Sequence, residues 1–222
     1  MELKQLTIIC GHYGTGKTNL SVNLAVDAAK AGKKVTLIDM DVAKPYFRSS
    51  DHAGSLRSLG VKILVPSFAN TNVDVPAVPE GAAAALDDGT VIMDIGGDDA
   101  GATVLGSIRD KIGRRDYDMW YVVNRYRSMV SDPESSAEML REIEAACRLR
   151  ATGVVNNSHL KDQTTPDVIR RSMEYAKRTA ELAGIPLVFT TCPEGLCGGL
   201  GEIGFLYPVN IYVKTPWEKE GN

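Results

Sequence analysis

Short runs of consecutive apolar residues alternate along this chain with longer segments in which apolar residues recur every three or four positions. The short runs are typical of strands buried on both faces of a parallel sheet, and the wider spacing is typical of helices. We therefore expect strands at Thr7–Cys10, Val35–Ile38, Val61–Val65, Val91–Met93, Met119–Val123, Gly153–Val155, Pro186–Thr190 and Val209–Val213.

The clearest helical segment extends from Lys17 to Ala31. Leu20 and Leu24 fall on one face at helical spacing, and Gly32 follows as a C-terminal cap. Typical capping residues and prolines mark the start of two later helices. Further helices are expected near Gly81–Leu86, from Ser131 or Asp132 toward Cys147 with Pro133 in the first turn, and from Pro166 after Thr165.

This alternation predicts an α/β fold of three layers, with a mostly parallel central sheet and helices on both faces. The stretch Pro66–Pro79 is rich in Asn, Pro and Asp and is expected to be a surface loop. Because no linker or internal repeat interrupts the pattern, residues 1–222 are expected to form a single domain.

The composition excludes several classes of function. Hydrophobic residues make up 44% and charged residues 24%, the balance of an ordinary globular protein. A net charge of −3 without a basic block argues against a nucleic-acid surface. No apolar stretch is long enough to span a bilayer, and the chain begins directly with a strand. We therefore expect no signal peptide, no stable membrane association and a cytoplasmic location.

The cysteines are expected to be reduced, as in most cytoplasmic proteins. Cys10, Cys147, Cys192 and Cys197 show no paired C-x-x-C spacing, which favours small core or loop thiols. The alternative is that Cys192 and Cys197 form half of a metal site shared between two subunits.

The segment Gly11–Thr18, with the sequence GHYGTGKT, carries the strongest chemical signal. It matches the P-loop pattern G-x-x-x-x-G-K-[ST] in full, after a predicted strand and before a predicted helix. Its glycines let backbone amides converge on phosphate oxygens at a helix N-terminus. Lys17 is expected to contact the β- and γ-phosphates, and Thr18 to bind Mg²⁺. The other nucleotide-binding residues expected here are Gly11, Gly14, Thr15, Gly16 and Asn19.

Acidic residues follow two of the predicted strands. Asp39 and Asp41 are two positions apart and so point to the same side of the second strand. Beside a P-loop they can bind Mg²⁺ through water and orient an attacking water. Asp94 can anchor the Mg²⁺ shell, and Gly97 can donate its backbone N–H to the γ-phosphate. Asp98–Gly101 is expected to be mobile, and ordinary turn acids remain the alternative for these positions.

The order of these motifs resembles the MinD/ParA class of P-loop ATPases. The chain has a P-loop, Asp-x-Asp after the second strand, Asp-x-x-Gly after a buried strand, and an Asn after Gly153–Val155. This class includes nitrogenase iron protein, the CooC-type metal-insertion ATPases and the CobQ/CobB nucleotide-binding domains. The likeness covers nearly the whole chain. It implies a P-loop NTPase fold, ATP and Mg²⁺ as ligands, and a homodimer that forms around the nucleotide.

The resemblance also implies roles for single residues. Asp41 matches the acid that positions the hydrolytic water, and Asp39 precedes it in switch I, so these two and Lys17 are the implied catalytic residues. Asp94 and Gly97 match switch II, and the implied metal site consists of Thr18, Asp41 and Asp94.

Base recognition is implied at two later positions. Asn156 matches the Asn that contacts the adenine amino group, and Pro193 and Glu194 fall in the base-flanking loop. Asn124 ends an earlier strand and is a rival for the base role. Because the chain has no Asn-Lys-x-Asp guanine motif, we expect ATP to be preferred over GTP.

The chain departs from the class at His12. Many members have a lysine there that crosses the dimer interface to the partner's nucleotide. A histidine is only partly charged at neutral pH, so Lys44 or Arg48 are alternative sources of the missing charge. His52 and His159 are expected to be plain loop residues.

Three functions are consistent with the sequence. The first is an ATP-driven switch that acts on an unidentified partner protein, possible clients being metal or redox enzymes under maturation. The second is an ATP-dependent carboxylate ligase of the dethiobiotin synthetase or cobyrinate synthase type, which needs a cationic pocket that Arg125 and Arg127 can form. The third is a nucleotide-binding module with negligible turnover. Weighed on the resemblance, the switch is favoured.

Overall fold

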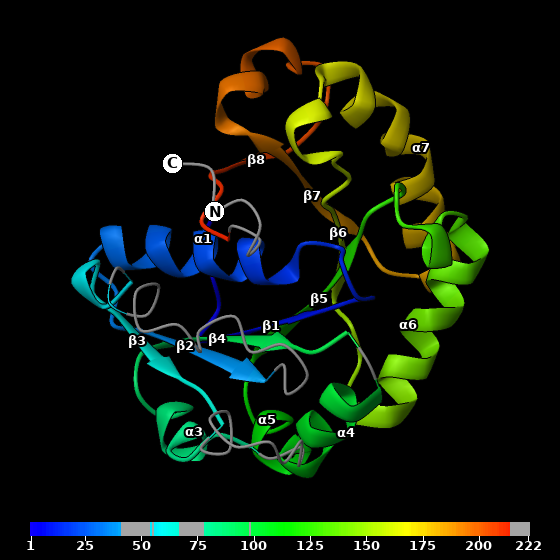
Figure 1. Ribbon diagram of the computed structural model, residues 1–222. Helices are drawn as coiled ribbons and strands as arrows, with labels where there is room; N and C mark the ends of the chain where they lie inside the picture. The colour runs from blue at the N-terminus through cyan, green and yellow to red at the C-terminus, as the bar shows by residue number, and fades with distance from the viewer. Residues whose placement is uncertain (41–53, 55, 67–77, 98, 214–222) are drawn as a thin grey trace, which may run out of the picture.

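The computed structural model describes residues 1–40, 54, 56–66, 78–97 and 99–213. Within them an eight-stranded sheet has the order β3-β2-β4-β1-β5-β6-β7-β8, and every neighbouring pair is parallel. The first strand therefore lies inside the sheet, between β4 and β5 (Figure 1). The strands are β1 (Leu6–Cys10), β2 (Val35–Met40), β3 (Val61–Leu64), β4 (Thr90–Ile95), β5 (Tyr117–Val123), β6 (Gly153–Asn156), β7 (Leu187–Pro193) and β8 (Leu206–Val209).

Helices cover both faces of this sheet, which confirms the predicted α/β architecture (Figure 1). α1 (Lys17–Lys30) packs on one face, over a core that includes Ile9, Leu37 and Ile92. The helices against the other face are α3 (Ala82–Ala85), α4 (Asp99–Ser107), α5 (Arg109–Ile112), α6 (Pro133–Cys147) and α7 (Pro166–Ala183). Short 3₁₀ helices are η3 (Ser128–Val130), η4 (Lys161–Gln163) and η5 (Glu194–Gly199).

The helix starts follow the predicted capping residues. The Asp132 carboxylate accepts a hydrogen bond from the Ser135 backbone N–H at 2.8 Å and caps α6. The Thr165 hydroxyl accepts one from the Val168 N–H at 3.3 Å and caps α7. Each cap satisfies a backbone donor that has no partner within its helix.

One expectation about a single segment is wrong, because the last strand was expected at Val209–Val213, yet β8 ends at Val209. Asp98–Gly101 was expected to be mobile, which stays a prediction; Asp99–Gly101 lie in the first turn of α4, and Asp98 lies outside the described residues. Of the expected loop Pro66–Pro79, residues 67–77 lie outside the described part of the chain.

The segment after β8 is bound to α1 instead of to a neighbouring strand. Asn23 exchanges two hydrogen bonds with the backbone of Asn210, at 2.9 and 2.8 Å. The Asn19 side-chain oxygen accepts from the backbone N–H groups of Tyr212 at 2.9 Å and Val213 at 3.2 Å. Side-chain amides thus replace a sheet ladder, which is why the strand pattern of this segment does not produce a strand.

Candidate functional site: the P-loop edge of the sheet

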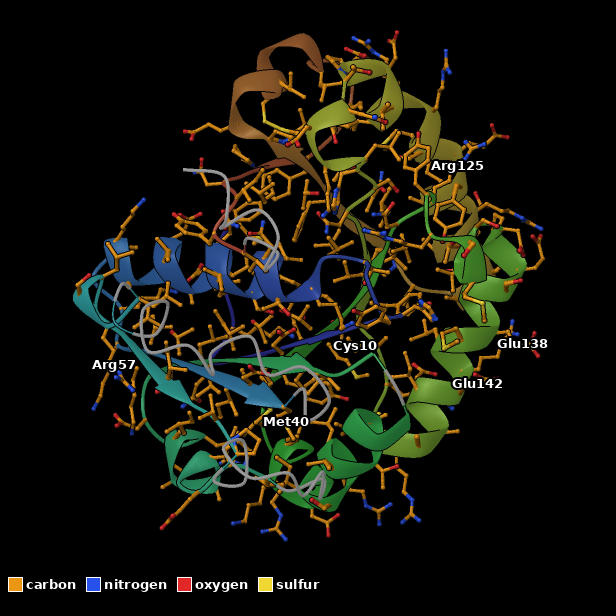
Figure 2. All side chains as sticks on the ribbon, viewed as in Figure 1. Cys10, Met40, Arg57, Arg125, Glu138 and Glu142 are labelled. Atoms are coloured by element: carbon orange, nitrogen blue, oxygen red, sulfur yellow. A yellow bond between two sulfur atoms is a disulfide. The ribbon has the colours of Figure 1, made fainter. Side chains whose placement is uncertain are left out.

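The P-loop connects β1 to α1 at the carboxyl edge of the sheet, the edge at which open parallel sheets bind ligands. Figure 2 labels Cys10 and Met40, which end β1 and β2 at this edge. The strand order brings the loop residues that follow β2, β4, β1, β5 and β6 into one row. Residues far apart in sequence can therefore contact the P-loop.

The carbonyl oxygen of His12 organises the P-loop internally. It accepts hydrogen bonds from the Lys17 ammonium at 3.0 Å, from the Thr15 hydroxyl at 2.8 Å and from the Thr15 backbone N–H at 3.3 Å. Lys17 is buried, with 7% of its surface exposed. Its charge is thus fixed within the loop, at the position from which a P-loop lysine reaches phosphates.

Two glycines are required by close contacts around this loop. Gly16 has φ 87°, and a Cβ there would lie 2.3 Å from the side-chain nitrogen of Asn157. A Cβ on Gly97 would lie 2.5 Å from the backbone nitrogen of Tyr13. The β4–α4 connection therefore packs its backbone directly on the P-loop, as expected for a segment that contacts the γ-phosphate.

Two of the predicted acids lie side by side next to the P-loop. The register pairs Asp39 of β2 with Asp94 of β4, and each is 1% exposed. Two residues earlier the register pairs Leu37 with Ile92, which both pack under α1. Because side chains alternate along a strand, the two carboxylates point to the same face as α1.

This pair of carboxylates fits a magnesium ion. Mg²⁺ prefers oxygen ligands and usually keeps several waters, so one or two carboxylates and a hydroxyl suffice beside phosphates. Thr18, half-buried in the first turn of α1, can supply the hydroxyl. Asp41 lies outside the described residues, and within the described part no group of three or more His, Cys, Asp or Glu side chains could bind a metal by itself.

The predicted base-contacting residue, Asn156, is fully buried. Its amide nitrogen donates to the Ser172 hydroxyl at 2.9 Å, and its oxygen accepts from the Ser158 N–H at 3.2 Å. Its rival Asn124 is also fully buried and accepts from the Tyr126 N–H at 3.0 Å. A contact between Asn156 and adenine would require these bonds to be exchanged, so the role of Asn156 stays a prediction.

The neighbouring Asn157 contacts the P-loop directly, and sequence reasoning missed it. Its amide nitrogen donates to the carbonyl oxygen of Thr15 at 2.6 Å, and its oxygen accepts from the Thr191 hydroxyl at 2.5 Å. It thus ties β6 and β7 to the phosphate loop. The only signal in the sequence is its place directly after a strand, which it shares with Asn156.

The loops after β5 and β6 are joined to each other above the P-loop. The Arg125 N–H donates to the Ser158 hydroxyl at 3.0 Å, and the Asn124 amide donates to the His159 carbonyl at 3.4 Å. This arrangement brings Arg127 to Gly14, where the Arg127 Nε atom lies 3.4 Å from the position of a Cβ. Arg127 Nε is buried and has no hydrogen-bond partner among the described residues.

His159, expected to be a plain loop residue, lies against the P-loop. Its Nε2 atom is 3.3 Å from the Cβ position of Gly16, and its Nδ1 accepts from the Lys161 N–H at 3.3 Å. Burial, with the nearby positive charges of Arg127 and Lys161, lowers the pKa of His159 from 6.5 to about 4. The imidazole is therefore neutral at physiological pH and carries its proton on Nε2.

The predicted base-flanking loop begins where β7 ends. Pro193 is the last residue of β7, and Glu194 is exposed at the start of η5. Cys192 and Cys197 on either side of them form a disulfide, with 5.8 Å between their Cα atoms. The expectation that these two thiols are reduced is therefore wrong in this structure, because the turn into η5 brings them together. Cys10 and Cys147 are free and buried, as expected.

Of the remaining predicted residues, some are placed by the structure and others lie outside its described part. His12 is half-buried, and its ring Nδ1 lies 3.0 Å from the carbonyl oxygen of the exposed Tyr13. Asn19 binds the C-terminal segment, as described above. Three residues lie outside the described part of the chain: Lys44, Arg48 and His52.

Together the fold and this edge define a P-loop nucleotide-binding domain. The family described as the CobQ/CobB/MinD/ParA nucleotide binding domain (CbiA) matches residues 6–188, and the chain belongs to this family. The chain is also 55% identical over 38 residues to an uncharacterised ATP-binding protein of Methanocaldococcus jannaschii. That match covers 17% of this chain and 14% of the relative.

Solved structures share the fold at low sequence identity. Chloroplast FtsY of Physcomitrella patens has a TM-score of 0.56 and 15% identity, covering 86% of this chain and 59% of that one. The signal recognition particle 54 kDa protein of Aeropyrum pernix, in complex with GDP, has a TM-score of 0.54 and 17% identity, covering 85% and 41%. The chain thus spans about half the length of these structures. Among the described residues no helix is long and apolar enough to cross a membrane.

Proposed function

We propose that this protein is an ATP-binding and slowly ATP-hydrolysing molecular switch that acts on a partner protein. The observation that carries the proposal is the complete P-loop, with Lys17 fixed inside it and the Asp39–Asp94 pair buried beside it. A structural turn between strand and helix has no need of the complete G-x-x-x-x-G-K-[ST] pattern, nor of a lysine buried inside the loop.

Different groups around the phosphates would have different roles. Backbone amides of the P-loop and the N-terminus of α1 bind the anion, and Lys17 can exchange the His12 carbonyl for a phosphate oxygen. Thr18, Asp41 and Asp94 would bind Mg²⁺, which supplies charge neutralisation at the phosphates. Asp41, preceded by Asp39, would orient the attacking water.

The proposed base is adenine. The chain lacks an Asn-Lys-x-Asp guanine motif, and the relative from M. jannaschii is described as ATP-binding. Asn156, Pro193 and Glu194 are the proposed base-contacting residues. Their position at the ends of the neighbouring strands β6 and β7 places them on the edge that carries the P-loop.

Exposed apolar side chains near the P-loop support a protein partner at this edge. Tyr13, Met129 and Leu160 are 54%, 69% and 38% exposed, and they belong to the loops after the adjacent strands β1, β5 and β6. A partner bound at this edge of the sheet would cover apolar side chains of the kind that binding surfaces use. The proposed occupant is a second copy of this chain in the ATP state, and the client released on hydrolysis would be a metal or redox enzyme.

The ligase alternative gains no support from the structure. It relied on Arg125 and Arg127 forming one cationic pocket, but the Arg125 guanidinium donates to the carbonyl oxygen of Arg171 on α7. Figure 2 shows Arg125 beside this helix. Arg127 alone faces the P-loop.

Calorimetric titration with Mg-ATP tests the proposal. Lys17→Ala removes a charge-assisted contact worth about 1.5–3 kcal/mol, so ATP affinity should fall roughly 10- to 150-fold. Lys30→Ala, an exposed lysine in the last turn of the same helix, is the matched control and should bind as the wild type does. Equal affinities of wild type and Lys17→Ala would refute the assignment of this P-loop as a nucleotide site.

A further inference from the structure

Phosphates bound at the P-loop would carry more negative charge than Lys17 alone can neutralise, so a second cationic side chain is expected near the loop. The crossing lysine of many family members is replaced here by His12, whose ring is engaged with the neighbouring Tyr13 carbonyl. A polyphosphate carries several negative charges, and its binding sites commonly add an arginine that contacts oxygens in a fork. Any such group must lie close to the loop.

Arg127 is the described residue that meets this requirement. Its Nε, Cδ and Cζ atoms lie 3.4, 3.6 and 3.6 Å from the Cβ position of Gly14, so the guanidinium packs on the loop itself. No acidic side chain pairs with it in the described part of the chain. Its buried Nε also lacks an acceptor there. A buried donor without an acceptor is rare and calls for an explanation, which a bound anion would provide.

The neighbouring His159 differs from Arg127 in charge. Its Nδ1 accepts the Lys161 N–H, so its proton is on Nε2, the atom closest to Gly16. Because His159 is neutral, it adds no positive charge at the loop. It can still donate one hydrogen bond from Nε2 to a phosphate oxygen, while Arg127 supplies the charge. The bonds of Asn157 and those between the β5 and β6 loops hold the backbone that carries both residues against the P-loop.

We propose that Arg127 and His159 bind the phosphate chain of the nucleotide within one subunit, with Arg127 supplying the positive charge that the family's crossing lysine supplies from a partner. The ligand class is an organic polyphosphate, and these two residues are phosphate-contacting groups. This inference rests on the proposed nucleotide-binding function. It implies that the phosphates need no cation from a second subunit.

The first test uses inorganic tripolyphosphate and ATP as separate probes in calorimetric titrations. Arg127→Gln should weaken both by roughly 10- to 100-fold, the effect of losing one charge-assisted contact. His159→Ala should weaken both several-fold, and His159→Gln, which keeps a neutral donor, should restore much of the loss. Arg125→Gln is the matched control, because the Arg125 guanidinium is directed to α7, and should change neither affinity.

Different failures have different meanings. A loss for ATP without a loss for tripolyphosphate would assign Arg127 to the base or ribose and overturn the proposal. So would an Arg127→Gln protein that binds both probes as Arg125→Gln does. If instead wild type fails to bind ATP, or Lys17→Ala binds as wild type does, the nucleotide-binding function itself fails.

A second test needs no variant and so does not depend on the folding of Arg127→Gln. The wild-type protein is treated with phenylglyoxal, which modifies accessible guanidinium groups, and the modified peptides are identified by mass spectrometry. Tripolyphosphate should slow the modification of Arg127 several-fold and leave that of the exposed Arg125 unchanged. Equal rates at Arg127 with and without tripolyphosphate would overturn the proposal.

Discussion

Removing the Asn157 side chain should both destabilise the protein and loosen its phosphate loop. The amide makes two buried hydrogen bonds, one to the Thr15 carbonyl and one from the Thr191 hydroxyl. In Asn157→Ala both of these groups stay buried but lose their hydrogen-bond partner. A buried polar group without a partner destabilises the fold by about 1–3 kcal/mol. Because the Thr15 carbonyl and the Thr191 hydroxyl can recover part of this through water, we expect a loss of about 2–4 kcal/mol in the free energy of unfolding.

Thermal and urea unfolding measure this loss. For a chain of this size about 1 kcal/mol corresponds to a shift in Tm of roughly 2–4 °C, so Tm should fall by roughly 4–16 °C. Thr191→Val and the double variant complete a mutant cycle, in which the coupling energy between Asn157 and Thr191 should be about 1 kcal/mol. ATP affinity of Asn157→Ala should fall roughly 3- to 10-fold, because the loop is no longer preorganised.

Two results would refute this reasoning. A change in unfolding free energy below about 0.5 kcal/mol, the typical effect of a surface substitution, would show that the Asn157 bonds do not stabilise the fold. A large loss of stability with unchanged ATP affinity would show that the bond to Thr15 does not shape the phosphate loop. The two readouts therefore separate the structural role of Asn157 from its role at the site.

Two further predictions concern proton binding and turnover. Because the folded pKa of His159, about 4, is below its ordinary value, the stability it contributes is present above pH 6.5 and is lost as pH falls toward 4. The free energy of unfolding, measured with urea, should therefore fall by about 1–2 kcal/mol between pH 7 and pH 5 because of His159. In His159→Gln this contribution to the pH dependence should be absent. Asp41→Ala should keep ATP affinity, lose hydrolysis by roughly 10²-fold or more and remain a dimer with Mg-ATP in light scattering; a protein that stays monomeric while hydrolysing ATP quickly would contradict the switch.

The sequence predicts those features of the fold that depend on local pattern. The runs of apolar residues correspond to strands, and the caps at Asp132 and Thr165 start helices where expected. The Val209–Val213 run has the same local pattern but is not a strand. Its backbone is bound by Asn19 and Asn23, whose proximity to it depends on the sheet order and cannot be derived from periodicity.

In the candidate site too, local sequence predicts some features and the order of strands in the sheet determines the others. The P-loop is contiguous, so the sequence alone predicts its place between a strand and a helix, which β1 and α1 confirm. Asn157, His159 and Arg127 act on the loop only because β5 and β6 follow β1 in the sheet. Nothing in the sequence distinguishes Asn157 from Asn156, since both come at the end of the same predicted strand. In the structure Asn156 is the last residue of β6, and Asn157, directly after it, contacts the loop.

The attachment of the C-terminal segment to α1 has a consequence for how the protein is made. Asn19 and Asn210 are 191 residues apart in the chain, yet they share a hydrogen bond. At a synthesis rate of about 5–20 residues per second, roughly 10–40 s separate the two on the ribosome. During that interval the helix that carries Lys17 and Thr18 lacks its asparagine contacts, and Asn157 and Thr191 are made late as well. The nascent chain therefore has its phosphate-binding motif long before the residues that shape it, so the nucleotide can stabilise the complete domain only after Asn210 has been made.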